Sequence, residues 1–162
     1  MELSSSPSVP AGYLLTKLAQ LTAARFGEAI AALGLRPRHY GLLVAVAGGP
    51  PGSQQQLGQV MGVAASAVVG MLDDLEGLGA VVRRQDPNNR RQFTVELTEQ
   101  GRALLAEATR LGAELDTQLL GALGEAERAA FQQTLYGLAV QLGLVVPVAP
   151  EALASPTTAS AG

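Results

Sequence analysis

The spacing of the apolar residues is helical along most of this 162-residue chain and changes once, directly after Gly79. Residues 80–84 and 92–97 instead form two short runs of β type. The second run alternates apolar with polar residues, and its apolar members are Phe93, Val95 and Leu97. The segment 85–91 between the runs contains Asp-Pro-Asn-Asn, which favours a turn. We therefore expect one two-stranded hairpin within an otherwise helical domain.

Local signals set the limits of the helices before this hairpin. Ser53 followed by Gln56 is a capping box, and Gly62 stands where a left-handed turn would end a short helix over 54–61. Another helix is expected over 64–78, so that two short helices joined at a glycine predict a helix-turn-helix. The remaining predicted helices cover residues 13–33 and 37–47, a long segment capped by Thr98, and a last segment after Gly124.

The composition excludes several kinds of site. The chain has no cysteine and a single histidine, His39, which rules out disulfides, thiolate metal ligands and thiol-based sensing. We therefore expect no metal and no cofactor. No nucleophile stands with a base and no glycine-rich phosphate loop follows a strand, so an enzyme is not expected. The sequence shows neither a signal peptide nor an apolar run of about 20 residues, and we expect a cytoplasmic protein that does not contact a membrane.

Charge is concentrated in one place. The net charge of −3 argues against a protein that coats nucleic acid without regard to sequence. Four arginines nevertheless gather on the predicted hairpin, at Arg83, Arg84, Arg90 and Arg91. Arginines on a short hairpin are suited to the negative potential of a narrow DNA groove, whereas the alternative interpretation is a solvated tip that keeps the hairpin soluble.

Three segments together resemble the MarR family of bacterial regulators. They are residues 57–63, residues 72–79, and residues 82–91 continuing to 95–101. The resemblance implies a mainly α fold with a small β-wing, in which a winged helix-turn-helix lobe is joined to N- and C-terminal dimerisation helices. The implied domain covers 13–144, with the helix-turn-helix at 53–79, the wing at 80–97 and dimerisation helices at 13–34 and 98–144. Residues 1–12 are expected to be a flexible N-terminus and residues 145–162 a disordered tail.

The function implied by the resemblance is that of a homodimeric, sequence-dependent transcriptional regulator; a repressor is expected, and an activator is the alternative. Each subunit would place the helix 64–78, the recognition helix, in a major groove and the wing beside a minor groove of double-stranded DNA with an inverted repeat. An alternative interpretation is a degenerate winged-helix dimer that binds a protein or small ligand without binding DNA. The apolar run Ala64-Ala65-Ser66-Ala67-Val68-Val69-Gly70 supports this alternative, because it offers little hydrogen bonding to base edges.

The residues expected to touch DNA come from four parts of the chain. Arg90 and Arg91 match the wing arginines of the family, and Asn89 replaces an aspartate that is usual there. Asp74 stands on the recognition helix where a cation is common. The candidate DNA-binding residues are Arg38, Ser53, Gln54, Gln55, Ala65, Ser66, Ala67, Arg83, Arg84, Arg90 and Arg91. We expect binding that relies on phosphate contacts and DNA shape.

Family members are often released from DNA by small aromatic or phenolic anions. By that resemblance, Tyr13, Arg25, His39 and Tyr40 are candidates for binding an effector, because they combine aromatic ring faces with donors for an anion. The alternative is that these residues cap helices or pack in the core, as a lone histidine or tyrosine commonly does.

Overall fold

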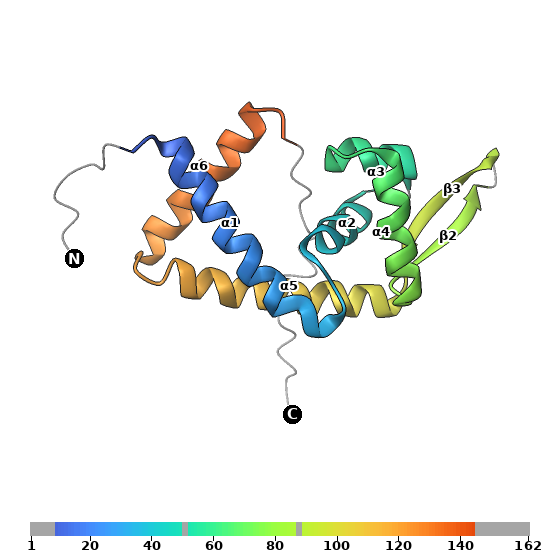
Figure 1. The fold of residues 1–162 in the computed structure, drawn as a ribbon, viewed down its shortest axis with the longest axis horizontal. Helices are drawn as coiled ribbons and strands as arrows, with labels where there is room; N and C mark the ends of the chain where they lie inside the picture. Colours follow the sequence, from blue (N-terminus) through green and yellow to red (C-terminus); the bar gives the residue numbers. More distant parts are fainter. Residues whose placement is uncertain (1–8, 50–51, 87–88, 145–162) are drawn as a thin grey trace, which may run out of the picture.

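The computed structural model describes residues 9–49, 52–86 and 89–144, and these form a mainly helical domain with one small sheet (Figure 1). The helices are α1 (Ala11–Ile30), the 3-10 helix η1 (Ala31–Leu33), α2 (Pro37–Gly48), α3 (Gln54–Met61), α4 (Ala65–Gly77), α5 (Glu99–Leu119) and α6 (Glu125–Gln141). Helix α1 begins at Ala11, so it includes the last two residues of the segment 1–12 that the sequence assigned to a flexible N-terminus. The rest of that segment up to residue 8, and the tail 145–162, lie outside the described residues.

The helix-turn-helix forms where the local signals predict it. The Ser53 backbone N–H donates to Gln56 Oε1 at 2.8 Å, and the Gln56 backbone N–H donates to Ser53 Oγ at 3.3 Å, which completes the capping box of α3. Gly62 ends α3 with φ 64°, in the left-handed region that glycine adopts without strain. The sequence prediction of α3 and of its limits is therefore confirmed.

The sheet is larger than the predicted hairpin. Strands β2 (Val81–Asp86) and β3 (Asn89–Leu97) are antiparallel, and both extend into the segment 85–91 that the sequence analysis treated as a turn. A third strand, β1 (Gly52–Ser53), pairs with β3 through Gly52 opposite Val95 and Ser53 opposite Thr94, which gives the order β1-β3-β2. The predicted two-stranded hairpin is confirmed as β2 and β3. The third strand was not predicted, because β1 is only two residues long and forms by pairing with a strand some forty positions away.

The core joins the helix-turn-helix to the long helix α5. Its largest fully buried side chains come from α1, α2, α4, β3 and α5, and they are Ile30, Leu42, Leu43, Leu72, Leu75, Leu105, Val68 and Val95. On α4, the buried residues Val68, Met71, Leu72 and Leu75 recur at helical spacing and turn one side of this helix inward. The opposite side of α4 stays exposed, and it lies at the same end of the molecule as α3 and the hairpin (Figure 1).

The other end of the molecule is apolar and exposed. Helices α1 and α6 lie there, and α5 runs along the base of the molecule between the two ends (Figure 1). Ile30 is the one buried residue of α1, and α6 has none. The large apolar side chains exposed on these helices are Tyr13, Leu14, Leu15, Leu18 and Leu21 of α1 and Leu135, Tyr136, Leu138 and Val140 of α6; we call this set the terminal apolar face. Among the described residues, no helix is long and apolar enough to cross a membrane.

The start of α5 is fastened to the start of the wing. Thr98 Oγ1 accepts the Gly101 backbone N–H at 2.9 Å and donates to the Gly79 carbonyl at 2.6 Å. The Thr98 backbone N–H donates to the Ala80 carbonyl at 3.1 Å. Helix α5 therefore comes so close to Ala80 that a Cβ at Gly101 would lie 1.8 Å from the Ala80 oxygen.

We expect Gly101→Ala to destabilise the protein by at least about 3 kcal/mol, because the added carbon meets backbone that cannot move without breaking the Thr98 hydrogen bonds. Denaturant unfolding of the purified protein measures this loss. Gly70→Ala is the matched control, since a Cβ at Gly70 would have nothing within 4 Å and alanine should stabilise α4 by about 1 kcal/mol. Equal stability of the two variants would contradict the close approach at Ala80.

Candidate nucleic-acid interface

At the start of α4, the exposed side of the helix-turn-helix consists of small, uncharged side chains. Ala65, Ser66 and Ala67 are all exposed there, directly after the turn at Gly62. From α3, Gln55 is exposed and Gln54 is half-buried. The structure thus brings five of the predicted DNA-contacting residues to the same helix pair. Ser53 lies beside them, but its hydroxyl already accepts the capping hydrogen bond of α3.

Arg83 is directed toward the recognition helix and not toward solvent. It lies on β2 opposite Val95, on the inner face of the sheet, and its side chain is 21% exposed. The guanidinium forms ion pairs with Asp73 and with Glu76, the latter at 3.5 Å between Nε and Oε2. The Arg83 backbone N–H also donates to Glu76 Oε1 at 3.1 Å. These contacts fasten the wing to α4.

The other predicted arginines have different surroundings. Arg84 projects from the opposite face of the hairpin, is 64% exposed, and pairs with Glu96 at 3.0 Å between Nε and Oε2. Arg38, in the first turn of α2, reaches Asp74 Oδ2 at 3.4 Å. Arg90 and Arg91 belong to β3, but their side chains lie outside the described part of the structure. The four hairpin arginines therefore do not form one patch, since Arg83 and Arg84 point to opposite faces.

His39 is the one buried polar residue in the core of the described chain, and both of its ring nitrogens are engaged. Nδ1 accepts the Arg36 backbone N–H at 3.3 Å, which caps α2, and Nε2 lies 3.1 Å from Asp74 Oδ2. Burial lowers the pKa of His39, and this effect outweighs the opposing effect of the Asp74 carboxylate. The ring is therefore neutral at pH 7, with its proton on Nε2 donated to Asp74.

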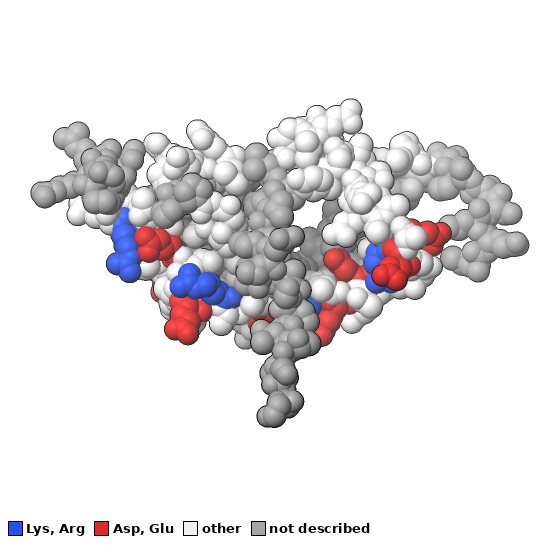
Figure 2. Space-filling view, turned by 180° about the vertical axis from the view of Figure 1, so that it is seen from behind, with Lys and Arg blue, Asp and Glu red and all other residues white. Residues whose placement is uncertain are grey.

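The described surface carries its charges in mixed groups. On the face seen in Figure 2, blue and red side chains lie next to each other, and the described residues form no large patch of one sign there. Within the described ranges, no group of three His, Asp or Glu residues could hold a metal ion. The lobe thus offers local cations and exposed small side chains to a partner.

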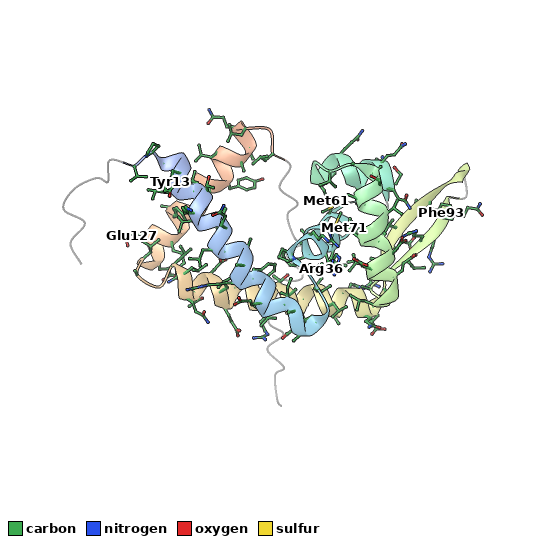
Figure 3. The ribbon with its side chains drawn as sticks, viewed as in Figure 1. Tyr13, Arg36, Met61, Met71, Phe93 and Glu127 are labelled. Atoms are coloured by element: carbon green, nitrogen blue, oxygen red, sulfur yellow. The ribbon has the colours of Figure 1, made fainter. Side chains whose placement is uncertain are left out.

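The candidate effector residues do not form one group. Tyr13 lies near the outer end of α1, whereas His39 and Tyr40 lie in the first turn of α2, close to the labelled Arg36 (Figure 3). Tyr13 and the inner end of α1 are about 25 Å apart along the helix. Lys17 Nζ lies 5.5 Å from the Tyr13 ring centroid. Arg25 is exposed on α1.

Tyr40 lies where α1, α2 and α5 meet. Its ring packs edge-on against Phe26 of α1, with 5.1 Å between the ring centroids, and its hydroxyl lies 3.3 Å from Thr109 Oγ1 of α5. His39, the neighbouring residue, turns to Asp74 on the other side of α2. Tyr40 therefore links α2 to both α1 and α5.

Sequence reasoning missed the partners of these side chains. Asp73 and Glu76 hold Arg83, Asp74 holds His39 and Arg38, and Thr109 meets Tyr40. The sequence analysis considered only Asp74, as a departure from a basic recognition helix, and assigned no role to Asp73 or Glu76. The i, i+3 spacing of Asp73 and Glu76 does place both on one side of α4, which is the signal that a shared basic partner lies there.

Comparison with known proteins identifies the family. A model of the MarR family matches residues 33–92. The repressor NicR of Pseudomonas putida is 30% identical over 119 residues, which cover 74% of this chain and 75% of NicR. The Escherichia coli regulator HosA is 32% identical over 94 residues, or 58% of this chain and 70% of HosA. The chain belongs to the MarR family.

Other relatives of this MarR-family chain extend the comparison. A Thauera aromatica protein named as a transcriptional regulatory protein for the hcr operon is 33% identical over 109 residues, and the match spans 67% of this chain and 63% of that protein's length. The repressor CouR, solved on a 23-mer DNA duplex, superposes with a TM-score of 0.73 at 31% identity, covering 80% of this chain and 92% of CouR. A crystal structure of MarR shares the fold, with a TM-score of 0.78 at 23% identity over 86% of this chain and 95% of MarR.

Arg83 and Arg84 are neighbours with different structural roles, and their substitution separates these roles. We expect Arg83→Ala to lower the free energy of unfolding by about 1–2 kcal/mol, because it leaves Asp73 and Glu76 without their cation beneath the wing. Arg84→Ala should change it by less than about 0.5 kcal/mol, since its pair with Glu96 is exposed. Urea unfolding of both variants tests the assignment, and a larger cost at Arg84 would contradict it.

Proposed function

We propose that this protein is a homodimeric transcriptional repressor that binds double-stranded DNA through its winged helix-turn-helix. The observation that carries the proposal is the exposed start of α4, where Ala65, Ser66 and Ala67 follow a correctly capped α3 and stand clear of the core. The similarity to CouR, which was solved on a DNA duplex, supports the same use of this lobe. A regulator of this kind acts on DNA in the cytoplasm.

The structure favours DNA binding through phosphates and groove shape. At the start of α4, Ser66 is the exposed side chain that can donate to a base edge, and the flanking alanines can contact thymine methyl groups. Gln54 and Gln55 of α3, half-buried and exposed, carry amides that can donate to the DNA backbone or to a base. Arg90 and Arg91 of the wing supply charge to a neighbouring groove. Modest discrimination between sequences is the expected consequence.

We propose that the terminal apolar face closes the dimer. Leu15 and Leu18 of α1 are 44% and 52% exposed, and Leu138 of α6 is 44% exposed. In a single subunit these apolar side chains remain in water, which favours their burial against a partner. If the same face of two subunits pairs isologously, these side chains are buried, and the dimer has the two-fold symmetry that an inverted repeat requires. This end lies away from the wing, so pairing leaves α3 and α4 free (Figure 1).

We propose that a small aromatic ligand releases the protein from DNA. CouR of Rhodococcus jostii, solved with p-coumaroyl-CoA, superposes with a TM-score of 0.70 at 26% identity over 84% of this chain and 96% of CouR. In this chain, Tyr40 supports such a role because its ring and hydroxyl lie at the junction of α1, α2 and α5. A ligand that separates these helices would move the lobe relative to the dimer end.

The DNA-binding proposal is tested by titration against DNA from upstream of the protein's own gene, at two salt concentrations. We expect saturable binding that weakens with salt, because phosphate contacts release counterions. Arg90→Ala plus Arg91→Ala should weaken binding to all sequences and lower the salt slope by about one for each arginine that contacts phosphate. Arg25→Ala plus Arg110→Ala removes the same charge from exposed sites outside the lobe and should leave binding nearly unchanged.

If a folded dimer binds neither this DNA nor random duplexes, the proposal of a DNA-binding repressor is overturned. The degenerate winged-helix dimer, which binds a protein or small ligand, would then be the better function. Equal effects of the two double substitutions would instead show that total charge, and not the wing, governs binding.

The dimer proposal is tested by sedimentation of variants that place a charge in the terminal apolar face. We expect Leu18→Asp or Leu138→Asp to yield monomers at micromolar concentration, because each buries an unpaired carboxylate in the interface. Val63→Asp is the matched control, since Val63 is 39% exposed but lies in the helix-turn-helix. Wild type that sediments as a monomer, or a Leu18→Asp dimer as tight as wild type, would contradict the interface.

A further inference from the structure

The recognition helix is held by two different kinds of contact. Its apolar residues, including Leu72 and Leu75, bury one side of α4 in the core. Apolar contact stabilises the packing but is not directional, so it does not by itself fix how α4 is rotated about its axis. Hydrogen bonds depend on angle and distance and do fix such rotation. The contacts of this second kind between α4 and α2 converge on Asp74.

We propose that Asp74 is a positioning residue of the recognition helix: by accepting the Nε2–H of buried His39, its carboxylate fixes the orientation of α4 against α2. The proposal rests on the DNA-binding function proposed above. It gives a structural role to an acidic residue on a helix that is proposed to face phosphates. The carboxylate acts within the protein and does not contact DNA.

The geometry of His39 makes this contact specific. The ring is 3% exposed, and its Nδ1 is already occupied by the Arg36 backbone N–H at the start of α2. The ring therefore cannot turn over without losing the cap, and its Nε2–H points along a fixed line. Asp74 Oδ2 lies at the end of that line, 3.1 Å away. A rotation of α4 that moved Asp74 would leave a buried N–H without an acceptor, which is costly.

The charge of Asp74 is balanced locally. Arg38 of α2 reaches the same carboxylate oxygen at 3.4 Å, and Arg36 lies in the residues just before this helix. His39 is neutral, because burial lowers the pKa of its ring. Asp74 and Arg38 thus form a nearly neutral pair on the outer edge of the lobe. This pairing reduces the repulsion that an unpaired carboxylate on the recognition helix would exert on phosphates.

The alternative is that Asp74 affects DNA only through its charge. Two substitutions at this position separate the possibilities. Asp74→Asn removes the charge but keeps a carbonyl oxygen that accepts from His39, so it serves as the matched control. Asp74→Ala removes both the charge and the acceptor. The quantity to measure is the ratio of affinity for DNA from upstream of the protein's own gene to affinity for random duplex of the same length, at fixed salt.

We expect Asp74→Ala to lower this specificity ratio about tenfold, the equivalent of one hydrogen bond at about 1.4 kcal/mol, and Asp74→Asn to keep it within about twofold of wild type. If charge alone matters, both variants will bind every duplex more tightly by the same factor, and the positioning role is overturned. Unchanged ratios in both variants overturn it as well.

Nuclear magnetic resonance gives a readout that does not depend on DNA. His39 is the only histidine, so the ring nitrogen signals of the labelled protein need no assignment. We expect a pure Nε2–H tautomer with a slowly exchanging ring proton in wild type and Asp74→Asn, and loss of that slow exchange in Asp74→Ala. A mixture of tautomers in wild type would overturn the contact. If wild type binds no DNA while the tautomer is as expected, the proposed DNA-binding function fails, but the contact by which Asp74 orients α4 against α2 is supported.

Discussion

The junction at Thr98 is the contact on which the arrangement of the lobe depends. One hydroxyl accepts the Gly101 N–H and donates to the Gly79 carbonyl, so the end of the helix-turn-helix and the start of α5 share a single side chain. Gln100 adds a hydrogen bond from Nε2 to the Leu78 carbonyl at 2.8 Å. Because β2 begins at Val81 and β3 ends at Leu97, the same junction also fixes the base of the wing. The recognition helix, the wing and the long helix therefore meet at one point.

Local signals allowed much of this fold to be predicted from the sequence. The capping box at Ser53, the left-handed glycine at Gly62 and the cap at Thr98 each act over three or four residues, and each was placed correctly. What the sequence did not reveal depends on distant pairing. Strand β1 exists because Gly52 meets Val95, and the hairpin strands lengthen because pairing continues into a segment whose composition favours a turn.

The same limit applies to the candidate site. The elements that carry Ser66, Gln55 and the wing arginines could be predicted, because the helix-turn-helix has a local pattern. The partners of the arginines could not, since Arg38 and Asp74 are 36 positions apart and Arg83 and Asp73 are ten apart. Because Arg83 and Arg84 are adjacent in the sequence, they were expected to belong to one basic patch. Alternation along β2 instead sends Arg83 inward and Arg84 outward.

The acidic side of the recognition helix gives the lobe its internal order. Asp73 and Glu76 face the wing through Arg83, and Asp74 faces α2 through His39 and Arg38. The helix is thus held from two sides by hydrogen bonds and ion pairs, while its small exposed residues remain free at the other end. Small side chains such as these alanines form few directional contacts with DNA. A helix that carries them can distinguish DNA by its shape only if the position of the helix is well fixed. The carboxylates that look unfavourable for a DNA-binding helix are what supply that fixed position.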